Sequence, residues 1–320
     1  GMKGLTESTL DGWFKKTVEL LKPLYEELKW EVFSCDYVQV DETTVPVINR
    51  EKHKADKEYL WMVRSVMERL VIFHYDGGSR AGAVIESLAN QYNFKGYLQC
   101  DGFAGYETAF KANPDVRLLN CLVHIRRHFE QALDENREMA QHALTQIQHI
   151  YKIERQCDEA GLSYDERRQT RQELSRPIME AMKVWMETEG IKYSPSSLTG
   201  KAITYAYTKW DNIMRCLDDG RLYWDNNLAE NVQRPITLSR KNFLFCGNHE
   251  AAVNMSVICS LLATCKAHDV NPRVYLNDVI AQMPYHKKAT QEELLNLLPH
   301  KWKLKHPECV LTKQKEESCN

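Results

Sequence analysis

The sequence predicts an α/β protein: a mixed five-stranded sheet flanked by helices, with a large all-helical insertion before the last helix of the sheet domain. The first observation is a series of short strand-like apolar runs between residues 37 and 75. The second is helical periodicity from about residue 127 to 217. The third is a late helix, from residue 226, that carries polar residues on one face.

Composition limits the class of protein. With 320 residues, 43% apolar and 27% charged, the chain has enough apolar side chains for one large core or two modest ones. No apolar run approaches the roughly 20 residues that span a bilayer, and no secretory segment follows the first residues, so we expect a cytoplasmic protein without a membrane partner. Its ten cysteines include no Cys-x-x-Cys pair, which favours reduced thiols and argues against a zinc-finger site.

The net charge of −2 argues against a dedicated DNA-binding domain, which usually carries a basic excess. An acidic catalytic centre would subtract from that excess, however, and the basic residues form local clusters that could bind phosphate. Arg167-Arg168 lies within an alternating-sign helical pattern, and we interpret it as a solvated helix face.

The first 75 residues predict one helix and then a meander. Ser8 opens a helical pattern whose apolar stripe includes Trp13 and continues at three- and four-residue spacing. From residue 36 the period becomes strand-like, and charged or glycine-containing breaks separate the runs. We expect antiparallel strands at residues 37–40, 45–48, 59–63 and 70–75.

Beyond the glycine turn at residues 76–79, a helical stripe at 83–89 should cross the sheet. Two further strands, 97–100 and 116–122, flank a loop and short helix. Asp225 can cap a late helix starting at Asn226, which Pro235 should kink or end. The predicted divisions are a lead-in helix (1–30), the first part of the core (31–126), a helical insertion (127–220), the core with the late helix (221–268), a C-terminal helical extension (269–304) and a disordered tail (305–320).

Three short stretches far apart in the chain each place one carboxylate among polar or glycine neighbours: residues 40–43, 100–103 and 226–231. An acidic residue at the end of an apolar strand does not build a core, so it must be solvated, paired or bound to a cation. Three such residues suggest one divalent-metal site.

The order of strands and helices, with an acid on the first strand, after the fourth strand and on a late helix, is that of the ribonuclease H-like nucleotidyl-transfer fold. Several stretches sharpen this and closely resemble the insertion sequence 66 transposase family. They are Asp41-Glu42-Thr43, Cys100–Tyr106, Cys121–Arg127, Asn226–Asn231, Arg240–Phe245, Tyr275–Val279 and Leu297–Trp302.

The resemblance implies that Asp41, Asp101 and Glu230 form the Asp-Asp-Glu triad of a DNA transposase, catalysing hydrolysis at transposon ends and strand transfer of the 3′-hydroxyl into target DNA. It implies two Mg²⁺ or Mn²⁺ ions per site, with Asp41 bridging both and the other two acids each favouring one. Phosphodiester cleavage suits such a site independently, because two metals can supply the nucleophile and stabilise the leaving oxygen.

Each acid also has a simpler interpretation. Asp41 could be an exposed strand end, Asp101 part of a turn, and Glu230 a surface partner of Arg234 at i, i+4. Their joint occurrence, in this order and with matching flanks, favours the triad. Glu42 is the chief rival ligand, although strand alternation turns it away from Asp41.

Other candidate residues surround the triad. We expect His124, from the Cys121-x-x-His124 signature, and Asn227 to support the site. Arg126, Arg234, Arg240 and Lys241 are candidate phosphate contacts, with exposed ion pairs as the alternative. Aromatic residues at these spacings are usually core, as we predict for Trp61 and Trp210, whereas Trp224 could offer a base-stacking platform.

The resemblance also implies DNA and a homo-oligomer on DNA as partners, with possible accessory proteins of the same element. Members of the family usually carry an upstream DNA-end-binding region, after which this chain is expected to begin. Two alternatives remain: a ribonuclease H-like structural nuclease or junction resolvase, against which the helical insertion argues, and an inactive remnant that binds DNA or a partner without cutting.

Overall fold

The computed structural model describes residues 5–311, apart from the side chains of Ser239, Arg240, Lys241 and Phe243. Its five strands form one mixed sheet in the order β3-β2-β1-β4-β5, which confirms the predicted α/β class. The strands are β1 (Tyr37–Asn49), β2 (Lys54–Ser65), β3 (Val71–His74), β4 (Gly96–Cys100) and β5 (Val116–Asn120).

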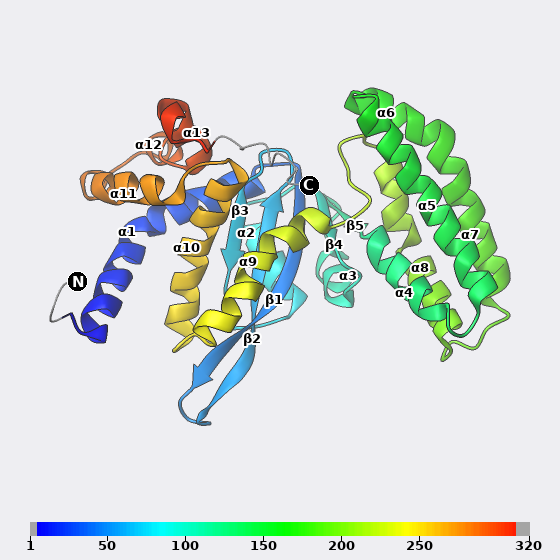
Figure 1. Ribbon diagram of the computed structural model, residues 1–320, viewed down its shortest axis with the longest axis horizontal. Coiled ribbons are helices and arrows are strands. Elements are labelled where there is room, and N and C mark those ends of the chain that lie inside the picture. The colour runs from blue at the N-terminus through cyan, green and yellow to red at the C-terminus, as the bar shows by residue number, and fades with distance from the viewer. Residues whose placement is uncertain (1–4, 312–320) are drawn as a thin grey trace, which may run out of the picture. The chain divides into compact units, whose positions relative to one another are not determined.

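Helices make up most of the rest of the described chain (Figure 1). None of these helices is both long and apolar enough to cross a membrane. They are α1 (Glu7–Phe33), α2 (Gly82–Gln91), α3 (Ala104–Phe110), α4 (Leu122–Ala132), α5 (Arg137–Glu159), α6 (Tyr164–Thr170), α7 (Arg176–Gly190), α8 (Leu198–Met214), α9 (Asn227–Phe243), α10 (His249–Ala267), α11 (Pro272–Gln282), α12 (Gln291–Leu295) and α13 (Pro299–Lys305).

The chain divides into two compact units, one formed by residues 1–96 with 229–320 and the other by residues 97–228. We call them unit 1 and unit 2 and describe each by itself.

Unit 1 packs α9 and α10 against β1, β2 and β3 (Figure 1). Its core is apolar, because inward-facing strand residues meet the apolar stripes of both helices. The core residues are Val45, Val47, Leu60, Met62, Val71, Phe73, Tyr75, Ala229, Ile236, Cys246 and Ala252.

Side-chain hydroxyls satisfy the backbone of β3 in this unit. The Val71 N–H donates to Thr264 Oγ1 at 3.1 Å, and the Phe73 N–H donates to Ser260 Oγ at 2.7 Å. Thr264 and Ser260 lie four residues apart on α10 and therefore share a face. The Tyr25 hydroxyl of α1 donates to the Phe73 carbonyl at 2.7 Å. Neutral groups thus pair the polar backbone atoms of a buried edge strand.

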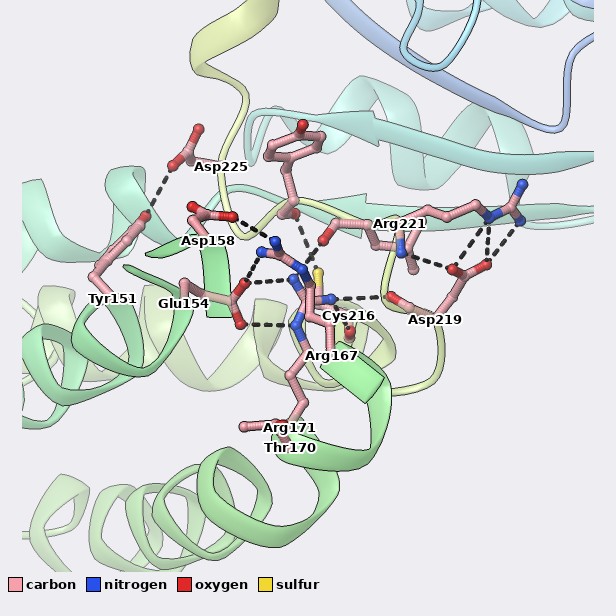
Figure 2. A network of polar contacts seen from close by, with 12 residues as sticks. Tyr151, Glu154, Asp158, Arg167, Thr170, Arg171, Cys216, Asp219, Arg221 and Asp225 are labelled. Atoms are coloured by element: carbon pink, nitrogen blue, oxygen red, sulfur yellow. Dashed lines mark hydrogen bonds and ion pairs between the residues drawn. The ribbon is translucent and has the colours of Figure 1, made fainter. Parts of the chain in front are cut away.

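Unit 2 is built largely from α4, α5, α7 and α8, which pack against one another, with α8 also against β5 (Figure 1). Its centre holds a buried ion pair: the Arg171 guanidinium donates to both Glu154 carboxylate oxygens at 2.7 Å. The same guanidinium donates to the carbonyls of Cys216, Asp219 and Leu222 at 2.9–3.0 Å (Figure 2). Arg171 is only 2% exposed and opens a π-helical stretch that ends at Ser175.

Several local predictions need correction. Residues 37–40 and 45–48 are one continuous strand, because Thr43 and Thr44 continue the ladder opposite Leu60 and Tyr59 and threonine is a good strand former. Strand β5 ends at Asn120, and the next residue, Cys121, already occupies the position before the first turn of α4.

The late helix α9 passes through Pro235 instead of ending there. A proline removes only one helical hydrogen bond, and core packing by Ala229 and Ile236 holds the helix on both sides of it.

Two surface assignments also differ from expectation. Arg167 is not solvated: its side chain is 16% exposed and pairs with Glu154 at 3.0 Å and with Asp158. Trp13 is 51% exposed, because the buried stripe of α1 begins at Val18. Residues 312–320, most of the tail predicted to be disordered, lie outside the described part of the chain.

Candidate active site

Asp41 lies within β1 on the face that α9 covers. Side chains alternate along a strand, so Gln39, Asp41 and Val45 share a face, and Val45 packs in the core with Ala229 of α9. The Ala229 N–H also donates to Gln39 Oε1 at 3.1 Å. Glu230 follows Ala229, and Gln39 lies two residues before Asp41. The first turn of α9, which carries Glu230, therefore lies over the stretch of β1 that carries Asp41.

Glu42, the rival ligand, occupies the opposite face of β1. Its Oε1 accepts from Arg80 Nε at 2.9 Å, and its side chain is only 3% exposed. Arg80 is 46% exposed, so this ion pair joins a buried carboxylate to a partly exposed guanidinium and accounts for Glu42 without a metal.

Asp101 belongs to unit 2 and follows directly after β4. Its Oδ1 accepts from the Phe103 N–H at 2.8 Å, and its carbonyl accepts from Asn120 Nδ2 at 2.8 Å. Asp41 has a parallel arrangement, because its Oδ1 accepts from the Glu42 N–H at 3.0 Å. A backbone N–H therefore orients one oxygen of each aspartate.

Asp41 and Glu230 belong to unit 1 and Asp101 to unit 2. Among the residues that the structure describes, no three His, Cys, Asp or Glu side chains form a group that could hold a metal ion. That the three predicted carboxylates share one metal site stays a prediction.

The segment before α9 is anchored to the start of α4. Asp225 Oδ1 accepts from the Asn227 N–H at 3.0 Å, so its side chain bonds the first N–H of the helix, which begins at Asn227 and not at Asn226 as expected. The Asn226 N–H donates to Cys121 Sγ at 3.3 Å, and the Leu122 N–H donates to the Trp224 carbonyl at 2.8 Å.

Cys121 of the Cys121-x-x-His124 signature therefore has a structural role, because its sulfur anchors the segment before α9. Burial raises the pKa of the Cys121 thiol to about 12, so at neutral pH it stays protonated. His124 lies in the first turn of α4, with Nε2 3.3 Å from Arg127 Nη1.

Tyr205 of α8 is a site neighbour that the sequence analysis missed. A Cβ added to Gly102 would overlap the Tyr205 hydroxyl oxygen, and the Tyr205 ring lies 4.1 Å from the His128 ring. Burial raises the pKa of the Tyr205 hydroxyl, and the Asp101 carboxylate raises it further. The one sequence signal was a glycine directly after Asp101, which indicates a close approach but does not identify the partner.

The predicted phosphate contacts differ from one another. Arg126 is exposed and pairs with Glu130 at 2.9 Å along α4, as its alternative interpretation expected. Arg234 and Asn227 are exposed on α9. The side chains of Arg240 and Lys241 lie outside the described part of the chain.

The two aromatic predictions are confirmed, and the structure decides the case of Trp224, which was left open. Trp61 and Trp210 are buried core residues. Trp224 is not a stacking platform, because its side chain is 2% exposed. The Arg171 guanidinium lies over the Trp224 ring, with Cζ 5.5 Å from the ring centroid.

Comparison with known protein families matches residues 3–254 to the family described as "Transposase IS66 family". The chain belongs to the IS66 transposase family. Residues 260–300 match the IS66 C-terminal element, so the two matches together span both units.

Two relatives from Sinorhizobium fredii (strain NBRC 101917 / NGR234) are similar along almost the whole chain. "Uncharacterized protein y4hP" is 29% identical over 321 residues, covering 93% of this chain and 56% of the relative. "Uncharacterized protein y4jD" is 29% identical over 313 residues, covering 93% of this chain and 60% of the relative. The IS66 chain thus spans little more than half the length of these relatives.

Proposed function

We propose that this IS66 chain is the catalytic part of a DNA transposase that hydrolyses a phosphodiester bond at each transposon end and transfers the resulting 3′-hydroxyl into target DNA. The family supports a transposase role. The observation that carries the catalytic assignment is the Ala229–Gln39 hydrogen bond, since it sets the Glu230 turn over the Asp41 stretch.

The donor set fits Mg²⁺ or Mn²⁺, because Asp41, Asp101 and Glu230 offer only carboxylate oxygens, which hard divalent cations prefer. Two such ions, when bound, would activate the attacking oxygen and stabilise the leaving one. The chain contributes orientation: backbone N–H groups fix one oxygen of Asp41 and of Asp101. Asp41, Asp101 and Glu230 are the residues that would hold these ions.

In the proposed reaction, water attacks the phosphorus, the P–O3′ bond breaks, and the element end is left with a 3′-hydroxyl. In the same site, that hydroxyl then attacks a target phosphorus and gives up its proton. The target P–O3′ bond breaks, and the target strand leaves with a free 3′-hydroxyl. The proposed partners are transposon-end and target DNA, a second copy of the protein on DNA, and accessory proteins of the element. Arg126, Arg234, Arg240 and Lys241 are the proposed phosphate contacts.

The test is a nicking and strand-transfer assay with Mg²⁺ or Mn²⁺ on a plasmid carrying the element's ends. We expect Glu230→Gln to abolish cleavage and Glu42→Gln to retain it, because Glu42 pairs with Arg80 on the other face of β1. As a control, circular dichroism should show that both variants are folded. Equal cleavage by Glu230→Gln and the wild type would refute the triad, and a folded wild type that binds DNA without cutting would favour the inactive remnant.

A further inference from the structure

One face of α8, in the helical insertion, contacts the surroundings of Asp101. Tyr205, Lys209 and Asn212 are spaced at i, i+4 and i+7, so their side chains lie on the same side of the helix. All three belong to unit 2, as does Asp101.

Tyr205 makes the contact nearest to Asp101. The Gly102 backbone approaches the Tyr205 hydroxyl so closely that a Cβ would overlap both the oxygen and the ring carbon that bears it. The Tyr205 ring also contacts the His128 ring of α4, with 4.1 Å between the ring centroids. The tyrosine therefore contacts both α4 and the Asp101-Gly102 turn.

Asn212 supports the same turn through one intermediate. Its Nδ2 donates to Asn120 Oδ1 at 2.9 Å, and Asn120 Nδ2 donates to the Asp101 carbonyl at 2.8 Å. Asn120 is 3% exposed, so its buried side-chain amide depends on partners within the protein, which are Asn212, the Asp101 carbonyl and Cys100 Sγ.

Lys209 fixes the helix that follows the turn. Its Nζ lies 2.6 Å from Glu107 Oε1 in the first turn of α3, and its side chain is 7% exposed. Glu107 is 40% exposed, so the pair is buried only on its Lys209 side, and it joins α3, which follows the 101–103 loop, to α8.

We propose that the helical insertion positions Asp101, with Tyr205 as the principal positioning residue, so that removing Tyr205 impairs metal binding and cleavage without changing the reacting groups. This inference rests on the proposed function, because Asp101 matters here as a metal ligand. It gives the insertion a role in the site beyond spacing Asp101 from Glu230 along the chain. Groups that orient metal ligands typically change affinity or activity by about 10- to 100-fold when removed.

The decisive experiment is a double-mutant cycle on Gly102→Ala and Tyr205→Ala, with Mn²⁺ affinity and the kcat and KM of plasmid nicking as readouts. We expect each single variant to lower Mn²⁺ affinity and kcat by about 10- to 100-fold, with KM for DNA nearly unchanged. Because the added Cβ meets no tyrosine in the double variant, Gly102→Ala should cost little more once Tyr205 is Ala. Fully additive losses would overturn the proposal.

The matched control is Tyr207→Phe, two residues away on the same helix. Tyr207 is 44% exposed and its hydroxyl donates to Glu187 at 3.1 Å, away from Asp101. This variant should keep wild-type affinity and kcat. If Tyr205→Ala lowers only the unfolding free energy and keeps both values, the tyrosine is merely structural and the proposal is wrong.

A second readout separates this inference from the proposed function. The Phe103 amide donates to Asp101 Oδ1, so its hydrogen exchange reports on the ordering of the turn. Wild-type protein that neither binds Mn²⁺ nor nicks DNA would refute the proposed function, yet Tyr205→Ala should still accelerate Phe103 exchange about 10-fold or more. Unchanged exchange at Phe103 would overturn the positioning role whatever the activity.

Discussion

The two units of the molecule satisfy their buried polar backbone in opposite ways. In unit 1, hydroxyls of Ser260, Thr264 and Tyr25 pair with the backbone of β3 inside an otherwise apolar core. In unit 2, the Arg171 charge serves three carbonyls and one carboxylate at once (Figure 2). Hydroxyls can be removed one at a time, whereas a buried charge supports a whole segment. We therefore expect the stability of unit 2 to depend strongly on Arg171, whereas in unit 1 each hydroxyl should contribute a smaller amount to the unfolding free energy.

Arg171→Met should give the largest effect. The substitution leaves Glu154 as a buried carboxylate with fewer partners and frees three carbonyls of the 216–222 segment, at a cost of about 3–5 kcal/mol in unfolding free energy. Chemical denaturation followed by the fluorescence of Trp224, which lies under the guanidinium, measures it. The exposed neighbour Arg168→Met should change stability by less than about 0.5 kcal/mol. Similar costs for both variants would contradict the contrast between the units.

Because of the Glu154–Arg171 ion pair, we expect the stability of the protein to fall at acidic pH. Burial raises the pKa of Glu154, but the Arg171 hydrogen bonds and charge outweigh burial and hold the pKa below its usual 4.5. Because the folded-state pKa is depressed, this stabilisation is present above pH 4.5 and is lost as pH falls through the folded-state value. Denaturation of wild type and Glu154→Gln from pH 7 to 3 should show their stability difference shrinking on acidification. A stability difference that stays constant with pH would show that titration of Glu154 does not cause the loss of stability in acid.

In unit 1, Ser260→Ala should cost about 1–3 kcal/mol, because the Phe73 N–H loses its acceptor inside the core. Hydrogen exchange of the Phe73 amide measures this opening directly. Ser256→Ala on the same helix is the matched control, since its hydroxyl only donates to the Ala252 carbonyl of its own helix and its loss should cost less than about 1 kcal/mol. Equal exchange at Phe73 in both variants would show that β3 does not need the α10 hydroxyls.

The smallest effect concerns His268 in unit 1. Burial lowers the pKa of His268 from 6.5 to about 4, with help from the Lys303 charge. Protonation below pH 6.5 therefore favours the unfolded chain, and stability falls as pH drops from 6.5 towards 4. His268→Gln keeps a donor for the Glu68 carbonyl but does not titrate, so it should reduce this loss by about 1–2 kcal/mol. The same pH dependence in wild type and variant would place the titration elsewhere, such as at His300.

Periodicity in the sequence predicted which residues share a face of a strand or helix, whereas contacts between residues far apart in the chain could not be predicted. Alternation along β1 correctly set Asp41 and Glu42 on opposite faces, and Asp225 does bond the start of the late helix, although the helix begins one residue later than predicted. The role of Tyr205 beside Gly102 could not be predicted, because about a hundred residues separate them and helical spacing indicates only which face is apolar.

Charged residues were misjudged for a related reason. Arg167 was predicted to be solvated because the charges around it alternate in sign. The local sequence does not show that Glu154, on another helix, forms an ion pair with it in the interior. Trp224 remained open in the same way, since the Arg171 guanidinium that covers it comes from a distant turn. Burial of paired charges is set by tertiary packing and not by the local pattern.

Calorimetric titration of Mn²⁺ into the wild type and into Asp41→Asn, with DNA nicking assayed on the same samples, shows whether Asp41 belongs to a working metal centre. We predict that the wild type binds Mn²⁺ and nicks DNA, and that both activities are lost in Asp41→Asn while the protein stays folded. Mn²⁺ binding and nicking that are identical in the two proteins would show that Asp41 is not a ligand of the catalytic metal.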